Sequence, residues 1–229
     1  MNTKHFKDPE SLKMKILLPV FLTACFVFFG CQGLYNKTLE NVFGFEKREL
    51  LQKAVESVKG DQVETQKEFQ DAMSELQSIY GFKGGKLEKM YNRFKDAYED
   101  SQKQANVLHD RIQNMDRIAN SMFKEWSDEI RQYSSKTFAA DSRKKLDATQ
   151  KRYRELIESA RRSEAAMEPI LKKLHDHALY LKHNLNAASL GALKGETQSI
   201  QTDIQELNRR MDESIREANS FITVLREPS

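Results

Sequence analysis

Residues 87–126 read LEKMYNRFKDAYEDSQKQANVLHDRIQNMDRIANSMFKEW, and this stretch decides the fold. Steps of alternately four and three residues from Leu87 as far as Tyr133 meet apolar side chains at all but two positions, Ser101 and Glu129. This seven-residue rhythm is typical of helices that pack lengthwise against one another. It predicts one long helix near residues 86–133 with a narrow apolar seam.

The same rhythm runs through three further stretches of the chain. It predicts helices near residues 38–80, 141–185 and 189–226, whose seams begin near Leu51, Leu146 and Leu190. Short connections between long helices make neighbours antiparallel. The predicted fold is all-α: an elongated antiparallel bundle of about four long coiled-coil-like helices, which occupies residues 36–229 after an N-terminal signal segment.

The predicted breaks between the helices contain residues that end or start helices. Three glycines fall within residues 81–85, and glycine adopts left-handed backbone conformations at little cost. Residues 134–140 form the second break, with Asp141 as the expected N-cap of the third helix. Residues 186–189 form the third break. Within the third helix, Pro169 predicts a kink near Glu168, because proline removes one backbone hydrogen bond.

Composition argues against a nucleic-acid-binding protein. The whole chain carries 37 Lys and Arg against 34 Asp and Glu. Residues 1–30 hold four lysines and two acidic residues, so the remainder has 33 basic and 32 acidic residues. Binding to nucleic acid relies on a surplus of cations that contact phosphates, and a nearly neutral body lacks one. No nucleic-acid partner is expected.

The N-terminus predicts an exported, membrane-anchored protein. Residues 1–15 are polar and net basic, and residues 16–35 contain no charge. This pattern is typical of an export signal. The chain's two cysteines, Cys25 and Cys31, both lie in this apolar run, so a disulfide framework is excluded. A cysteine at the end of such a segment suggests a lipoprotein, in which the thiol receives a diacylglyceryl group and the cysteine becomes the first residue of the mature chain; with Cys31, residues 1–30 are the signal peptide.

Two cysteines compete for the lipid, and a third alternative remains. The motif before Cys25, Leu22-Thr23-Ala24, is closer to the usual pattern, but processing there would leave four apolar residues at the start of the mature chain. Cys31 is favoured, because it would be the eighteenth residue if translation began at Met14. Alternatively, residues 16–35 stay uncleaved as a signal anchor, which is just long enough to span a bilayer.

No motif predicts catalysis, a cofactor or a metal site. Glu-x-x-His, the motif of carboxylate-bridged metal bundles, does not occur. His175 and His177 are two residues apart, so a helix would direct them to different sides. The glycines before Lys86 lack both the spacing and the preceding strand of a phosphate loop. We therefore expect a protein that is not an enzyme.

Two features have both a functional and a structural interpretation. Residues 142–173 carry ten basic and five acidic side chains, which would suit anionic lipid. The favoured alternative is that the acidic first helix, with eight acidic and five basic residues in 46–80, lies beside this helix. The second feature is a cluster of an aromatic, a histidine and two asparagines just before a turn, which suits a recognition tip or a buried network that sets helix register. Its members are Tyr180, His183, Asn184 and Asn186.

Several segments resemble a Gram-negative envelope lipoprotein family catalogued as domain of unknown function 2959. They are Gly30-Cys31-Gln32, Gly84-Gly85-Lys86-Leu87-Glu88-Lys89-Met90-Tyr91-Asn92, Tyr98-Glu99-Asp100-Ser101, Met167-Glu168-Pro169 and Tyr180-Leu181-Lys182-His183-Asn184-Leu185-Asn186-Ala187. The resemblance implies that Cys31 carries the lipid. By the usual sorting pattern Gln32, which is not Asp, would direct the protein to the periplasmic face of the outer membrane. The family implies no reaction.

The function expected from these observations is that of a lipid-anchored structural or adaptor rod in the cell envelope. Its expected partners are the membrane and an envelope protein. A second copy of the chain would be a further partner if the exposed flanks of the apolar seams pair between two chains. The alternative is a membrane-shaping or lipid-binding helical module that uses the basic third helix. An inner-membrane location would follow if the signal anchor is retained.

Overall fold

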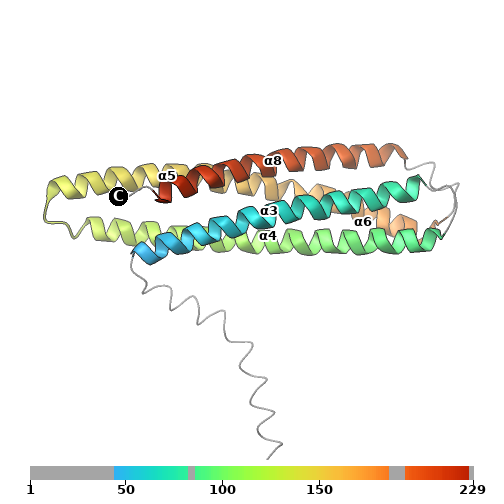
Figure 1. The fold of residues 1–229 in the computed structure, drawn as a ribbon, viewed down its shortest axis with the longest axis horizontal. Coiled ribbons are helices and arrows are strands. Elements are labelled where there is room, and N and C mark those ends of the chain that lie inside the picture. The colour runs from blue at the N-terminus through green and yellow to red at the C-terminus, as the bar shows by residue number, and fades with distance from the viewer. Residues whose placement is uncertain (1–43, 82–85, 186–193, 227–229) are drawn as a thin grey trace, which may run out of the picture. The chain divides into compact units, whose positions relative to one another are not determined.

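The computed structural model describes residues 44–81, 86–185 and 194–226. The chain divides into two units, residues 1–43 and 44–229, and the described residues belong to the second, here called the body. All their regular elements are helices, which run lengthwise in an elongated antiparallel bundle (Figure 1). The predicted fold class is confirmed. Cys25, Cys31 and Asn186 lie outside the described residues.

The described part of the body contains five helices, because the third predicted helix is split in two. They are α3 (Gly44–Tyr80), α4 (Leu87–Ile130), α5 (Lys136–Ala165), α6 (Met167–His183) and α8 (Lys194–Arg226). At about 1.5 Å per residue, the 44 residues of α4 span about 65 Å. None of the described helices is both long and apolar enough to cross a membrane.

The apolar seams fill one continuous core along the body. Phe69, Leu108, Leu156 and Phe221, one from each long helix, are fully buried. Two polar seam members, Ser101 and Ser163, are also fully buried, whereas Glu129 near the end of the α4 seam is exposed. All buried apolar residues of this core lie between Leu51 and Leu225, so the body has a hydrophobic core of its own.

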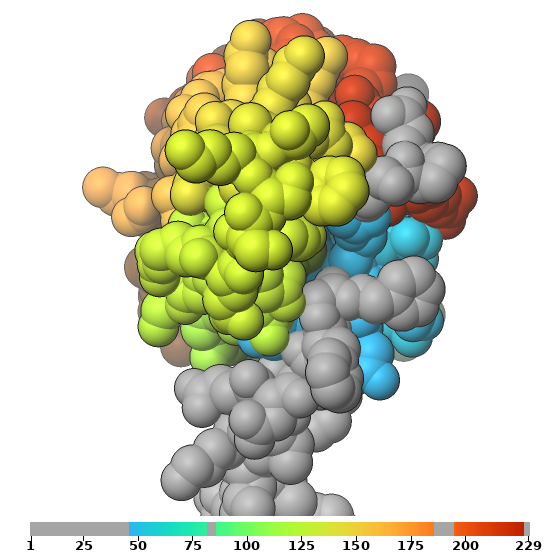
Figure 2. All heavy atoms as spheres, turned by 90° about the vertical axis from the view of Figure 1, so that its left-hand side faces the viewer, coloured from blue at the N-terminus to red at the C-terminus, as the bar shows by residue number. Residues whose placement is uncertain are grey.

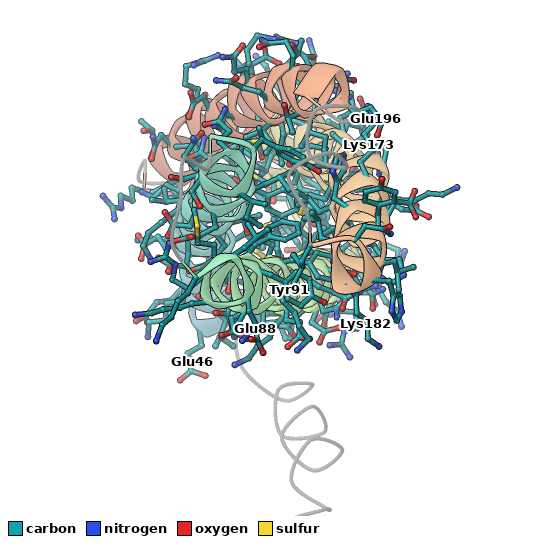
Figure 3. The ribbon with its side chains drawn as sticks, turned by 90° about the vertical axis from the view of Figure 1, so that its right-hand side faces the viewer. Glu46, Glu88, Tyr91, Lys173, Lys182 and Glu196 are labelled. Carbon is teal, nitrogen blue, oxygen red and sulfur yellow. The ribbon has the colours of Figure 1, made fainter. Side chains whose placement is uncertain are left out.

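The helices form a ring in the order α3, α4, α5 with α6, and α8. α3 packs against α4 and α8, and α5 packs against the same two helices. α3 and α5 are therefore diagonal to each other. The expectation that the acidic first helix lies beside the basic third helix is wrong, because α4 and α8 separate them. Figure 3 looks along the body and shows α3, α4, α6 and α8 at four corners.

The two ends of the body differ in their elements. One end carries the start of α3, the end of α8 and the α4–α5 turn, whose atoms stand in front in Figure 2. At this end the Nζ of Lys47 on α3 lies 2.9 Å from a carboxylate oxygen of Glu125 on α4. The other end carries the end of α3, the starts of α4 and α8, and the end of α6 (Figure 3).

The α4–α5 turn is earlier and shorter than the sequence predicted. α5 begins at Lys136, so residues 136–140 are helical and Asp141 is not its N-cap. The N-cap is Ser135, whose hydroxyl oxygen accepts a hydrogen bond from the backbone N–H of Phe138 at 3.4 Å. A serine side chain at the N-cap accepts a hydrogen bond from a backbone N–H of the first helical turn. The helix can therefore begin at Lys136, before the predicted start at residue 141.

The third predicted helix is interrupted at Ala166. The N–H of this residue bonds to the carbonyl of Ser163 at 3.3 Å, a turn contact of shorter range than an α-helical one. The break lies three residues before Pro169. Proline cannot donate to the carbonyl four residues earlier, that of Ala165, and its ring clashes with that carbonyl. With α6 starting at Met167, Pro169 falls in a first turn, where a missing N–H costs little.

Candidate functional site

An open groove lies beside the break in the third helix, between α4 and the α5–α6 junction. Its volume is about 860 Å³ and it is open along one side. It is lined by Tyr98, Gln102, Ala105, Asn106, His109, Arg161, Glu164, Ala165, Met167, Glu168, Leu171, Lys172 and His175. We call it the junction groove. Buried Ala105 and Met167 form its apolar floor, and charged side chains form its rim.

One wall of the junction groove carries a histidine between two polar partners. The Nδ1 of His109 on α4 makes a short contact with the Glu164 carboxylate on α5. The Nε2 of the same ring lies 2.6 Å from the side-chain amide nitrogen of Gln113. These contacts suit a neutral ring that donates through Nδ1 and accepts through Nε2. The hydrogen bond that His109 donates to the Glu164 carboxylate raises the pKa of His109 above its ordinary value.

The opposite end of the junction groove is closed by a tyrosine and a histidine. The hydroxyl of Tyr98 on α4 lies 3.1 Å from the Nδ1 of His175 on α6. Burial raises the pKa of Tyr98. Since each residue comes from a different helix, the pair links α4 to α6 just beyond the break, where the backbone has no continuous helix to hold α6 in place.

Next to the junction groove, polar side chains occupy core positions. The amide nitrogen of Gln62 on α3 donates to the hydroxyl of Ser163 on α5 at 3.1 Å, across the diagonal of the bundle. Ser163 in turn donates to the carbonyl of Ala160 at 2.7 Å. Among the described residues, the Oε1 of Gln62 and the Oγ of buried Ser214 on α8 have no hydrogen-bond partner. We call Gln62, Ser163 and Ser214 the polar layer.

A second tyrosine–histidine pair lies at the end of the body where α3 ends. The hydroxyl of Tyr80 lies 2.8 Å from the Nδ1 of His177, and the Nε2 of this histidine lies 3.5 Å from the carboxylate of Glu196. His177 is 4% exposed, and burial is the main cause that lowers its pKa below the ordinary value. The geometry holds this ring neutral, accepting from Tyr80 and donating toward Glu196.

The described members of the cluster predicted before the third turn lie at the surface. Tyr180 and His183 are exposed, and Asn184 is half-buried. The side-chain amide of Asn184 donates to the carbonyl of Tyr180 at 2.9 Å, a local contact along the chain. These three residues therefore do not form a buried network between helices. A role in recognition stays a prediction.

The interhelical histidine contacts were not predicted from the sequence. The sequence indicated no partner for His175 and His177, only an unfavoured metal site or an ordinary place at the surface or in a seam. In the structure they point to different neighbours, Tyr98 on α4 and Tyr80 on α3. The signal for one pair was present, because Tyr98 is a seam position of α4. Within the described ranges, no group of three or more His, Cys, Asp or Glu side chains is placed to hold a metal ion.

Comparison with known proteins gives the family of the chain. A family model described as "Protein of unknown function (DUF2959)" matches residues 35–225, which is more than half of the chain and nearly all of the body. No curated protein and no solved structure matched the chain. The resemblance seen in the sequence is thereby confirmed at the level of the family. The chain belongs to the protein family of unknown function DUF2959.

Proposed function

We propose that this protein is a lipid-anchored rod of the bacterial envelope that acts as a structural or adaptor element. The observation that carries the proposal is the position of α3. Its first residue, Gly44, follows Cys31 by only 13 residues, and the body that begins there is a long bundle with its own core. Thirteen extended residues reach at most about 45 Å, so a lipid on Cys31 would hold the start of α3 near a membrane.

The proposed location is the periplasmic face of the outer membrane. Gln32 after the proposed lipidated cysteine supports this location over the inner membrane, and an uncleaved anchor at residues 16–35 is the alternative. Several acyl chains bury many methylenes, each contributing about 0.8 kcal/mol, so such an anchor would hold the protein firmly.

Labelled palmitate tests the anchor. The wild-type chain is expected to take up the label and to fractionate with the outer membrane. Cys31→Ser is expected to abolish labelling and to release the body from that fraction, whereas Cys25→Ser, the matched control, is expected to keep both. If Cys31→Ser leaves labelling and fractionation unchanged, the lipoprotein proposal is wrong.

The junction groove is the proposed contact for an envelope partner. It combines an apolar floor with a charged rim, which suits the side of a partner segment, and it opens sideways from the body. A photo-reactive residue at Asn106, which lines the groove, is expected to cross-link a partner in intact cells. The same residue at Lys103, exposed on the same helix outside the groove, is the control. Equal cross-linking yields at both positions would show that the junction groove is not the contact for a partner.

A second function, lipid binding along the side of the body, is favoured by one observation. Because α3 is diagonal to α5, its acidic residues do not neutralise the basic helix. Among the described residues, six exposed cations of the stretch 142–173 make no ion pair: Arg143, Lys144, Lys151, Arg154, Arg162 and Lys172. If the body binds anionic vesicles and this binding weakens as salt is added, the result supports this function. Binding that depends neither on anionic lipid nor on salt would exclude it.

A further inference from the structure

The α4–α5 turn exposes two aromatic side chains at one end of the body. Phe138 is 66% exposed and Tyr133 is 49% exposed. Only three other large apolar side chains of the described residues are comparably exposed: Val63, Leu179 and Tyr180. Phenylalanine is usually buried, and two large aromatic side chains exposed at one turn provide an apolar surface that a partner can cover. We call Tyr133, Phe138 and the turn residues 131–135 the aromatic tip.

The aromatic tip is surrounded by basic side chains. Arg131 pairs with Asp128, and Lys145 pairs with Asp141 at 3.1 Å. Lys136, Arg143 and Lys144 are also exposed, and among the described residues they form no ion pair, although Arg143 donates to the Ser127 hydroxyl at 3.4 Å. Against these three cations, Glu46 and Glu129 are exposed carboxylates of this end that make no ion pair among the described residues. The unpaired charges therefore favour an anionic partner.

The aromatic tip lies at the same end of the body as the start of α3. Lys47, in the first turn of α3, bonds to Ser121 at 3.3 Å and to Glu125 on α4, a few residues before the turn. The tip extends past the start of α3 and the end of α8 (Figures 1 and 2). The uncharged stretch of residues 16–35 ends nine residues before Gly44. A chain of nine to thirteen residues spans at most about 45 Å, so it can bring this end of the body to a membrane that holds this stretch or Cys31.

We infer that the aromatic tip inserts Phe138 and Tyr133 into the headgroup region of the membrane that anchors the chain. Aromatic rings favour this region, and the cations around them bind phosphate groups and anionic lipids. The lipid tether and the tip together make two contacts with one surface, which holds the body with its α4–α5 end at the bilayer. This inference rests on the proposed lipid anchor.

Tryptophan fluorescence of the full chain in vesicles tests the inference. Trp126 is the chain's only tryptophan, so Trp126→Phe provides a background for new probes. In that background Phe138→Trp reports from the aromatic tip, and Leu179→Trp, 51% exposed on α6 toward the other end, is the matched control. Phospholipids brominated near the headgroup are expected to quench the probe at position 138 strongly and the probe at position 179 hardly at all. Anionic lipid is expected to increase the quenching at position 138.

Flotation of the same samples tests the lipid anchor separately from the membrane contact of the aromatic tip. Vesicles that carry the protein without quenching the probe at position 138 overturn the tip contact and leave the anchor standing. Protein that does not float overturns both. If Trp126→Phe loses helicity, the test uses an environment-sensitive dye on Phe138→Cys with Trp126 intact. A blue shift of the dye's emission on vesicles supports the inference, and the absence of a shift overturns it. Cross-linking from residue 138 to a second copy or to another protein instead of lipid also overturns it.

Discussion

At the scale of single residues, the polar layer is an exception within an apolar core. Gln62, Ser163 and Ser214 are each fully buried at seam positions. A buried polar side chain weakens a bundle unless all its groups are bonded, yet it disfavours other registers of the helices. Gln62 bonds across the diagonal to Ser163, so it ties together two helices that share little other contact.

Gln62→Met is expected to stabilise the body by about 1–2 kcal/mol. Methionine has nearly the shape of glutamine and removes a carbonyl oxygen that has no partner among the described residues. Ser163 keeps its bond to Ala160, so no new group is left unpaired. Urea unfolding of residues 44–229 measures the change. A loss of stability of similar size would show that the Oε1 of Gln62 is bonded in solution.

Two histidines are expected to give the stability of the body opposite dependences on pH. Burial lowers the pKa of His177 in the fold, so the unfolded chain takes up the proton more readily. Stability from this residue is present above the ordinary histidine pKa and is lost as the pH falls from there through the lower pKa of the folded state. The nearby carboxylate of Glu196 opposes this effect, but it is exposed. Glu164 raises the pKa of His109, so that contribution is present below the ordinary pKa and is lost as the pH rises through the raised one.

His177→Gln is therefore expected to reduce the loss of stability between pH 8 and pH 5. His109→Gln, the control, is expected to increase that loss, because it removes a contribution present only at low pH. Urea unfolding at the two pH values measures both variants against the wild type. If the two substitutions change the pH dependence in the same direction, the assigned environments of these rings are incorrect.

At the scale of elements, the break at Ala166 is caused by a single residue. Pro169→Ala restores an N–H that can donate to the carbonyl of Ala165 and join α5 to α6. An interior proline costs about 3 kcal/mol relative to alanine, and the stiffer unfolded chain offsets about 1 kcal/mol of that cost. The substitution is expected to stabilise the body by up to about 2 kcal/mol.

Circular dichroism and urea unfolding measure this effect, with exposed Glu168→Ala as the control. The joined helix is also expected to change the junction groove, so cross-linking from Asn106 in intact cells should fall in Pro169→Ala. If stability and cross-linking both stay at the wild-type level, the proline does not determine the break or the groove.

The sequence predicted which stretches of the chain form helices, but it predicted less well where each helix begins and ends. The heptad rhythm of α4 predicted buried Phe94, Leu108 and Met115 because apolar periodicity reports burial directly. The cap of α5 was misplaced because Ser135 and Asp141 are both good caps, and only the course of the chain decides between them. Pro169 predicted an interruption within the third helix, but not the junction groove beside it, since a groove depends on the neighbouring helix.

At the scale of the whole body, the order of the helices could not be obtained from the sequence. A four-helix ring can place the third helix diagonal to the first or beside it, and seam patterns fit both arrangements. The tyrosine–histidine contacts follow from that order, since Tyr98 meets His175 where α4 lies beside α6, and Tyr80 meets His177 where α3 reaches α6 across the bundle. This is why the candidate site was missed while its separate residues, such as Tyr98 and Met167, lay on predicted seams.

In the proposed function, the membrane holds the long body by the end where α3 begins. Energy transfer from a dye to acceptor lipids in vesicles that carry the full chain tests it, with the dye at Lys136→Cys or Glu88→Cys in a Cys25→Ser background. Glu88 is near the start of α4 and Lys136 is the first residue of α5, just past the end of α4, so these exposed positions lie about 65 Å apart. Strong transfer from residue 136 and weak transfer from residue 88 is the predicted result. Equal energy transfer from both positions, as expected for a body that lies flat on the bilayer, would rule out attachment by the α3 end.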